Sequence, residues 1–314
     1  MKVISRILFA VLLVLAIGFA ILRFQKKNDK LKIGIIQIVE HEALDKARNG
    51  FIDEMKNLGY KDADFDVQIA GGDISNLNSI SQKFVNDKKD LILAISTPAA
   101  QAIANVTKDI PILATAVTDF KNAGLVDSNE KPGRNITGTS DLVPIDNQIK
   151  LLKTLVPKCK KVGILYSSGE ANSKFQADIA TKEFNKIGIN TKDITASNSS
   201  EVQSVIECNT DVDALFLPTD NLIASCIPAV SKVSIAHKIP IICNDSDIVK
   251  KGALASHAMD YYELGKITAK QANKIIKKES TPKSMPIEFL TNTKLVVNDE
   301  VSKKLGISIP ENLE

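Results

Sequence analysis

The sequence predicts an α/β protein of two similar lobes, each with a doubly wound parallel sheet, joined by a hinge of several chain crossings. From Leu31 onward, short runs rich in Val, Ile and Leu alternate with longer segments of helical periodicity, which is typical of βαβ units. The pattern of the second half repeats that of the first. The 314 residues, 44% hydrophobic and 25% charged, also suffice for two domains with cores of their own.

The first thirty residues differ from the rest of the chain. An apolar run spans residues 7–22 (ILFAVLLVLAIGFAIL), with Lys2 and Arg6 before it and a basic segment after it. Such a segment is an export signal or a membrane anchor. We expect an uncleaved anchor at 1–30 that tethers an extracytoplasmic body, although the basic residues after the run favour the opposite orientation. No cysteine lies directly after the run, which excludes an acylated lipoprotein anchor.

The alternating pattern places the strands and helices of the body. Strands are expected at 31–38, 65–70, 91–96 and 111–117 in the first half, and at 161–167, 189–195, 213–218 and 239–243 in the second. Helices are expected at 42–58, 75–86, 98–107, 170–187 and 221–236.

The two halves match at a constant offset. KIGII at 32–36 corresponds to KVGIL at 161–165, and Pro111 corresponds to Pro240, in both cases 129 residues apart. This period is too long for a solenoid repeat and indicates a duplicated domain. The alternative is convergence, because strand, turn and helix patterns resemble one another easily.

Segments between the halves indicate where the chain crosses between lobes. Polar or glycine-containing stretches suited to crossing lie at 133–142, 256–261 and 285–291. Several crossings make a hinge. We therefore expect one lobe from 31–140 plus 261–279, and the other from 141–260 plus 280–314.

Composition excludes several classes of function. The net charge is +3, but without the first thirty residues the body has 34 basic and 36 acidic residues, so it lacks the basic surface that nucleic acids require. Four cysteines without a CxxC pair and three histidines without a helical pair predict no metal site. No GxGxxG or P-loop motif occurs, and we expect no cofactor.

Polar side chains at the predicted strand ends form the candidate site, because ligands of open parallel sheets bind outside the carboxyl ends of the strands. The first lobe offers hydroxyls and the second offers acids, a pairing that suits the carboxylate and ammonium of a zwitterion. Tyr166 ends a central strand and either stacks on the ligand or packs in the core. The candidates from strand ends are Gln37, Glu40, Ser96, Thr97, Thr118, Tyr166, Thr219, Asp220, Asn221 and Asp245.

Seven motifs resemble those of a known family. They are GIIQIVEHEALD at 34–45, AISTPAAQA at 94–102, TAVTD at 115–119, GTSD at 138–141, EANS at 170–173, LPTDN at 217–221 and DYYELG at 260–265. In order and spacing they are similar to the solute-binding proteins of ABC importers, and within these to the type that binds aromatic amino acids such as tryptophan.

The resemblance implies a periplasmic-binding-protein-like fold that closes on a free amino acid, works as a monomer, delivers its ligand to permease subunits and has no enzymatic activity. It also implies residue roles. Ser96, Thr97, Thr118 and Asp141 would bind the ligand carboxylate, Asp220 and Asp245 the ammonium, and Glu40, Tyr166 and Asn172 would shape the side-chain pocket.

Two alternatives use the same fold. One is a sensory protein that binds the same ligand and signals through a partner. The other is an amino acid racemase, because Cys208-Asn209-Thr210 matches a motif of two-domain racemases. Racemase motifs sit at strand ends, whereas this one follows a helix-like run and has no counterpart in the first half.

Overall fold

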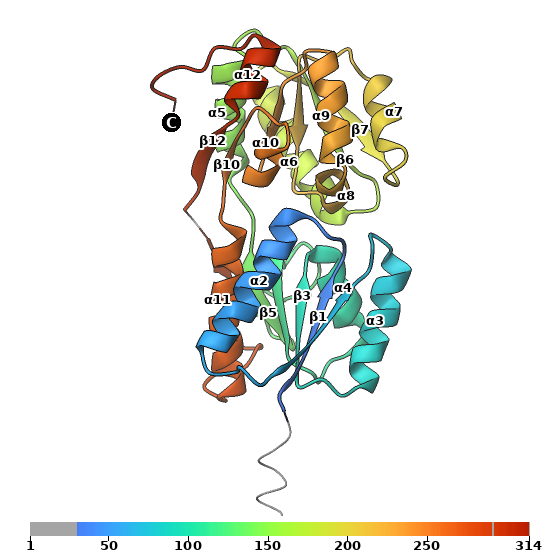
Figure 1. Ribbon diagram of the computed structural model, residues 1–314, viewed down its shortest axis with the longest axis vertical. Helices are drawn as coiled ribbons and strands as arrows, with labels where there is room; N and C mark the ends of the chain where they lie inside the picture. The colour runs from blue at the N-terminus through green and yellow to red at the C-terminus, as the bar shows by residue number, and fades with distance from the viewer. Residues whose placement is uncertain (1–29, 291, 314) are drawn as a thin grey trace, which may run out of the picture.

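A computed structural model describes residues 30–290 and 292–313 (Figure 1). The predicted anchor at 1–30 lies outside these residues except for Lys30. Within the described part of the chain, no helix is both long and apolar enough to span a bilayer.

The first lobe is a six-stranded sheet with helices on both faces. Its strand order is β11-β5-β4-β3-β1-β2, and all pairings are parallel. The strands are β1 (Lys32–Gln37), β2 (Asp64–Ile69), β3 (Leu91–Ile95), β4 (Ile112–Val117), β5 (Ile136–Ser140) and β11 (Glu288–Phe289). Helices α2 (Glu42–Asn57) and α11 (Tyr261–Ile276) pack together on one face, and α3 (Ile74–Asn86) and α4 (Thr97–Val106) on the other.

The second lobe repeats this plan with the order β12-β10-β9-β8-β6-β7, in which only β12 is antiparallel to its neighbour. The strands are β6 (Lys161–Ser167), β7 (Asn190–Ala196), β8 (Ala214–Leu217), β9 (Ile241–Cys243), β10 (Ala255–Ala258) and β12 (Lys294–Val297). The helices are α5 (Ile145–Leu155), α6 (Ala171–Lys186), α7 (Val202–Glu207), α8 (Asn221–Ser225), α9 (Ile227–Ala236), α10 (Ser246–Lys250) and α12 (Asp299–Leu305).

The strand orders of the two sheets correspond one to one, with β1 equivalent to β6 and β3 to β8. In both sheets the first strand pairs with the second and third, as Lys32 opposite Asp64 and Lys161 opposite Asn190 illustrate. The prediction of two similar parallel-sheet lobes is therefore confirmed.

The chain crosses between the lobes three times, after β5, after β10 and between β11 and β12 (Figure 1). One predicted boundary was wrong. Residues 280–289 pack with the first lobe, because β11 pairs with β5 and Thr137 donates a hydrogen bond to the Met285 carbonyl at 2.7 Å. The sequence had assigned 280–314 as a whole to the second lobe.

The helix predicted at 221–236 is two helices. Asp220 caps the first by accepting the Ile223 N–H at 2.8 Å, and a break follows at Cys226. Pro228 stands in the first turn of α9, where its missing N–H costs nothing, but it cannot continue the hydrogen-bond ladder of α8. The short α8 therefore ends at the face of the second lobe that meets the first (Figure 1).

Two glycines allow α2 and α11 to approach closely. A Cβ atom on Gly50 would lie 2.1 Å from the Tyr262 carbonyl oxygen, and one on Gly265 would lie 2.0 Å from that of Ala47. Because both obstacles are backbone atoms, they cannot move aside as a flexible side chain would. This contact fixes α2, whose first turn faces the second lobe (Figure 1).

Candidate functional site

A small cavity lies between the lobes, at the carboxyl ends of both sheets. The first lobe and the hinge contribute the start of α2, the residue after β5 and the first residue of α11, and the second lobe contributes the loops after β8 and β9. Its lining consists of His41, Leu44, Asp141, Pro218, Thr219, Asp220, Asn221, Ala224, Asn244, Asp245, Ile248 and Tyr261. The volume of about 20 Å³ holds about one water molecule. A larger ligand therefore requires the lobes to move apart.

Three buried carboxylates line this cavity, and no Lys or Arg is among its lining residues. Burial raises the pKa of Asp141 to about 6, against the opposing effect of a 3.1 Å hydrogen bond from the Tyr261 hydroxyl. Burial likewise raises the pKa of Asp245 to about 6. The pKa of Asp220 is also raised by burial. Carboxylates desolvated in this way favour a cationic partner.

The three carboxylates differ in their hydrogen bonds. Both oxygens of Asp220 are used by its own loop, which donates the N–H groups of Ile223 and Ser167 at 2.8 and 2.6 Å. Asp245 caps α10 by accepting the Asp247 N–H at 2.7 Å. Oδ1 of Asp141 makes no hydrogen bond of good geometry among the described residues, although the Thr118 hydroxyl acts to lower the Asp141 pKa. Asp141 and Asp245 therefore keep more capacity for a ligand than Asp220 does.

A fourth buried acid, Glu170, lies behind the cavity wall. It accepts the N–H groups of Asn221 and Leu222, each at 3.0 Å, and the side-chain amide of Asn221. Burial, followed by the charge of Asp220, raises the pKa of Glu170 to about 8. Glu170 thus orients the Asn221 amide so that its oxygen faces the other lobe.

Across the cleft, His41 Nε2 lies 3.4 Å from that Asn221 oxygen. Burial lowers the pKa of His41 to about 4, so the imidazole is neutral at physiological pH. A neutral ring with its proton on Nε2 donates to the amide oxygen. His41 and Asn221 therefore join the two lobes at the cavity wall.

The hydroxyl-bearing edge of the first lobe lies outside this small cavity. Thr97 and Thr118 are buried, and their hydroxyls make no hydrogen bond of good geometry within the described residues, although the Thr118 hydroxyl acts to lower the Asp141 pKa. Nearby, Ser96 has φ 96° and Ala116 has φ 54°, conformations that are strained for residues with a Cβ. Strain and unsatisfied hydroxyls at one sheet edge are typical of a functional surface.

The structure brings five of the predicted site residues together at the cavity, namely Asp141, Thr219, Asp220, Asn221 and Asp245. Ser96, Thr97, Thr118 and Asn172 lie at the facing sheet edges but do not line it. Asn172 donates to the Thr219 carbonyl at 3.0 Å, and its own oxygen is buried without a partner.

Three other predicted residues are directed elsewhere. Tyr166 packs into the core of the second lobe, and its hydroxyl donates to Asp193 at 2.8 Å. Gln37 is held by Val39, Asp45 and Arg48 inside the first lobe. Glu40 is exposed. None of these three side chains lines the cavity.

Several lining residues are not among the predicted site residues. Asn244 directly follows β9 and His41 follows β1 after a short loop, so both stand at strand ends, where the sequence indicates polar side chains. Leu44, Ala224 and Ile248 are apolar residues within the first turns of helices, where the pattern is the same as that of core residues. Cys208 of the racemase-like motif ends α7 and precedes β8, at the sheet edge opposite the cavity.

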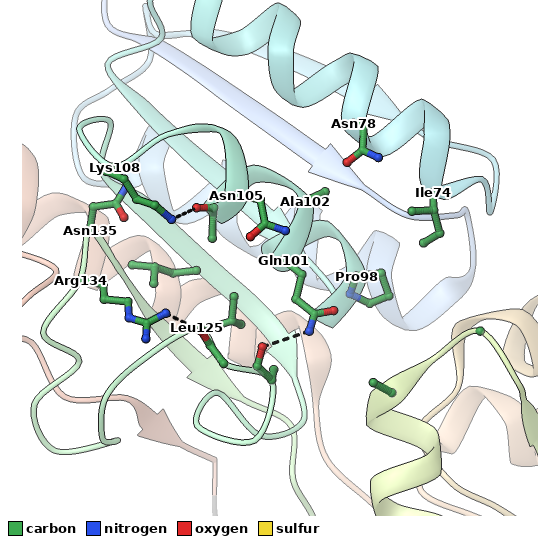
Figure 2. A pocket seen from close by; sticks show the side chains of 16 residues that line it. Ile74, Asn78, Pro98, Gln101, Ala102, Asn105, Lys108, Leu125, Arg134 and Asn135 are labelled. Carbon is green, nitrogen blue, oxygen red and sulfur yellow. Dashed lines mark hydrogen bonds between the residues drawn. The ribbon is translucent and has the colours of Figure 1, made fainter.

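A larger groove of about 510 Å³ lies between α3, α4 and the segment before β5 of the first lobe, and Gly169 and Ala171 of the second lobe line its far side (Figure 2). Its long polar side chains already bind backbone carbonyls. Gln101 donates to Ala123 at 3.0 Å, Arg134 to Gly124 at 2.6 Å, and Lys108 to Ala104. Among the described residues, no acidic side chain lines this groove, whereas the buried carboxylates Asp141, Asp220 and Asp245 line the smaller cavity.

Fold and cavity together define a two-lobed α/β binding protein. The chain belongs to the family of ABC transporter substrate binding proteins, whose profile matches residues 32–314. A tyrosine-binding protein of Clostridioides difficile is 46% identical over 289 residues, covering 90% of this chain and 84% of that protein. These matches confirm the family that the motifs indicated.

Comparison with solved structures supports the same family assignment. A Streptococcus pneumoniae ABC domain in complex with L-Trp is 36% identical and superposes with a TM-score of 0.88, covering 91% of this chain and 97% of that one. The ligand-free, open structure of a substrate binding protein from Clostridium difficile is 46% identical but scores 0.68, covering 90% and 96%. Because the more similar sequence superposes less well, the arrangement described here is closer to that of the L-Trp complex than to that of the ligand-free, open structure.

Proposed function

We propose that this protein captures a free aromatic amino acid, tyrosine or tryptophan, between its lobes for an ABC importer. The observation that supports this most directly is the set of buried carboxylates Asp141, Asp220 and Asp245 around a cavity with no lining Lys or Arg. An ammonium group would compensate their desolvation. The relatives that bind tyrosine and L-Trp support the aromatic side chain.

The parts of the ligand have separate candidate partners. Asp245 would pair with the ammonium as the family resemblance implies, and Asp141, which the resemblance assigns to the carboxylate, would take the place of Asp220, whose oxygens already accept backbone N–H groups. The unsatisfied hydroxyls of Thr97 and Thr118 would bind the carboxylate once the lobes admit the ligand. The apolar side chains Leu44, Ala224 and Ile248 would contact the ring.

Binding can be measured through the ligand itself. The chain has no Trp, so the fluorescence of bound tryptophan is free of background from protein tryptophan. We expect tyrosine and tryptophan to bind, leucine to bind more weakly, and 3-phenylpropionate, which lacks the ammonium, not to bind. Equal affinity for phenylpropionate and phenylalanine would contradict the assignment of the carboxylates.

We also propose that residues 1–30 anchor the protein outside the cytoplasmic membrane, where it meets permease subunits as a monomer. The apolar run at 7–22 supports the anchor. An alkaline phosphatase fusion after Lys30 should be active in cells and sediment with membranes. An inactive fusion would refute the export of the body.

A further inference from the structure

An ion pair links the lobes beside the cavity. Lys46 Nζ of α2 lies 2.7 Å from both carboxylate oxygens of Asp247 in α10. The Asp247 carboxylate is only 4% exposed, whereas Lys46 is 34% exposed. A second, more exposed pair joins Glu42 and Lys251 across the same gap at 3.4 Å. The first pair therefore combines short distances with burial of the acid.

The buried pair is connected to a wall of the cavity. Asp247 donates its backbone N–H to Asp245 Oδ1 at 2.7 Å, and Asp245 lines the cavity. Lys46 itself does not line it. The position of Asp247 is therefore coupled to that of Asp245 through this hydrogen bond and the two peptide units between the residues.

The charges favour the closed arrangement. Burial acts to lower the pKa of Lys46, but its bonds to Asp247 and Glu42 outweigh burial, and the net pKa is raised. Burial acts to raise the pKa of Asp247, but the bonds from Lys46 and Lys250 outweigh it, and the net pKa is lowered. Both groups are thus charged at physiological pH. Because they belong to different lobes, their pairing is available only when the lobes are close.

We propose that Lys46 is a positioning residue for ligand capture, which holds the Asp245 loop through Asp247 when the lobes close and so prolongs retention of the bound amino acid. A contact made in one of two states shifts the population toward that state. The inference rests on the proposed function for its ligand, but the closed-state pair itself does not depend on which ligand binds.

The test compares matched variants of the full-length chain in detergent. Lys46→Met keeps the aliphatic stem and removes the charge. We expect tryptophan affinity to fall about 5- to 10-fold, mainly through faster dissociation in stopped-flow fluorescence. Lys46→Arg should restore affinity to within about twofold, because its guanidinium still pairs with a carboxylate. The dependence of affinity on salt should weaken in Lys46→Met.

The control is Lys83→Met. Lys83 pairs with Asp66 and Asp87 at 2.8 Å, but all three residues lie within the first lobe. The tryptophan affinity of the Lys83→Met variant should equal that of the wild type. A double-mutant cycle with Asp247→Asn should be non-additive, the double variant binding about as well as Lys46→Met alone. Equal affinities of Lys46→Met and Lys83→Met, or an additive cycle, would overturn the proposal.

Hydrogen exchange of the ligand-free protein separates this inference from the proposed function. Lys46→Met should speed exchange at 217–224, which lines the cleft without contacting Lys46, and Lys83→Met should not. A wild type that binds no aromatic amino acid would refute the proposed function, and the exchange comparison would still decide the role of Lys46. Unchanged exchange at 217–224 in a folded Lys46→Met variant would refute it.

Discussion

Single residues in the cavity concentrate negative charge that the protein leaves uncompensated. Asp141 and Asp245 are buried, their pKa values are raised to about 6 by desolvation, and Asp141 has one oxygen without a partner. Ionised at neutral pH, such groups lower the stability of the folded chain while they favour a cationic ligand. Stability and binding should therefore respond in opposite directions when one of these charges is removed.

Asp245→Asn tests this opposition. Asn also caps helices well, so α10 should persist without the charge. We expect tryptophan or tyrosine affinity to fall by about 2–5 kcal/mol, because the ammonium loses a desolvated partner. The free energy of unfolding at pH 7 should rise by about 1–3 kcal/mol, because a buried charge with a raised pKa is gone. Calorimetry and urea unfolding provide the two measurements.

Tyr166→Phe is the companion variant, because the Tyr166 hydroxyl binds Asp193 away from the cavity. Its affinity should match the wild type. A large loss of affinity in this variant would show that Tyr166 contacts the ligand. An unchanged affinity in Asp245→Asn would show that Asp245 does not.

The sequence predicts the polar residues of the site better than its apolar ones. Asp220 and Asp245 follow strands, and the geometry of parallel sheets brings such positions together. Leu44 and Ile248 could not be separated from core residues by periodicity. Tyr166 does not line the cavity because alternation along β6 decides which face a side chain occupies, and its face is that of the core with Phe184.

At the scale of elements, the packing of α2 against α11 decides where the first lobe presents its half of the cavity. The start of α2 supplies His41 and Leu44, and its position depends on a backbone contact at Gly50. The sequence predicts both helices but not this contact, since a glycine within a helix gives no indication of its neighbour. The correspondence between the strand orders of the two lobes, in contrast, follows from the duplicated pattern.

Gly50→Ala should therefore destabilise the protein and weaken binding together. The new Cβ would lie 2.1 Å from the Tyr262 carbonyl oxygen, so α2 or α11 must shift. Overpacking of this kind costs about 1–3 kcal/mol, measurable by urea unfolding. The control is Gly169→Ala, where the nearest atom to the new Cβ is Ser167 Oγ at 3.7 Å. Equal stabilities of the two variants would contradict a tight helix contact.

At the scale of the whole molecule, closure and protonation are coupled. In the closed form Asp141 and Asp245 have pKa values of about 6, whereas in an open cleft contact with water would return them toward the ordinary value of about 3.9. The closed, empty form therefore binds more protons than the open form between about pH 4 and pH 6. Acidification through this window stabilises the closed, empty form, and that stabilisation is lost as the pH rises above 6.

The same protons compete with the ligand. An ammonium group pairs with ionised carboxylates, so protonation of Asp141 or Asp245 removes its partner while the lobes still close. We expect tryptophan affinity to fall as the pH is lowered from 7.5 to 5, in the range where ligand ammonium and carboxylate do not titrate. Over the same range, hydrogen exchange of the ligand-free protein at 217–224, corrected for its intrinsic pH dependence, should slow. In Asp141→Asn plus Asp245→Asn both trends should disappear. A pH dependence that persists in this double variant would assign the coupling to the remaining buried acids, Asp220 in the cavity and Glu170 behind its wall, whose pKa values burial also raises.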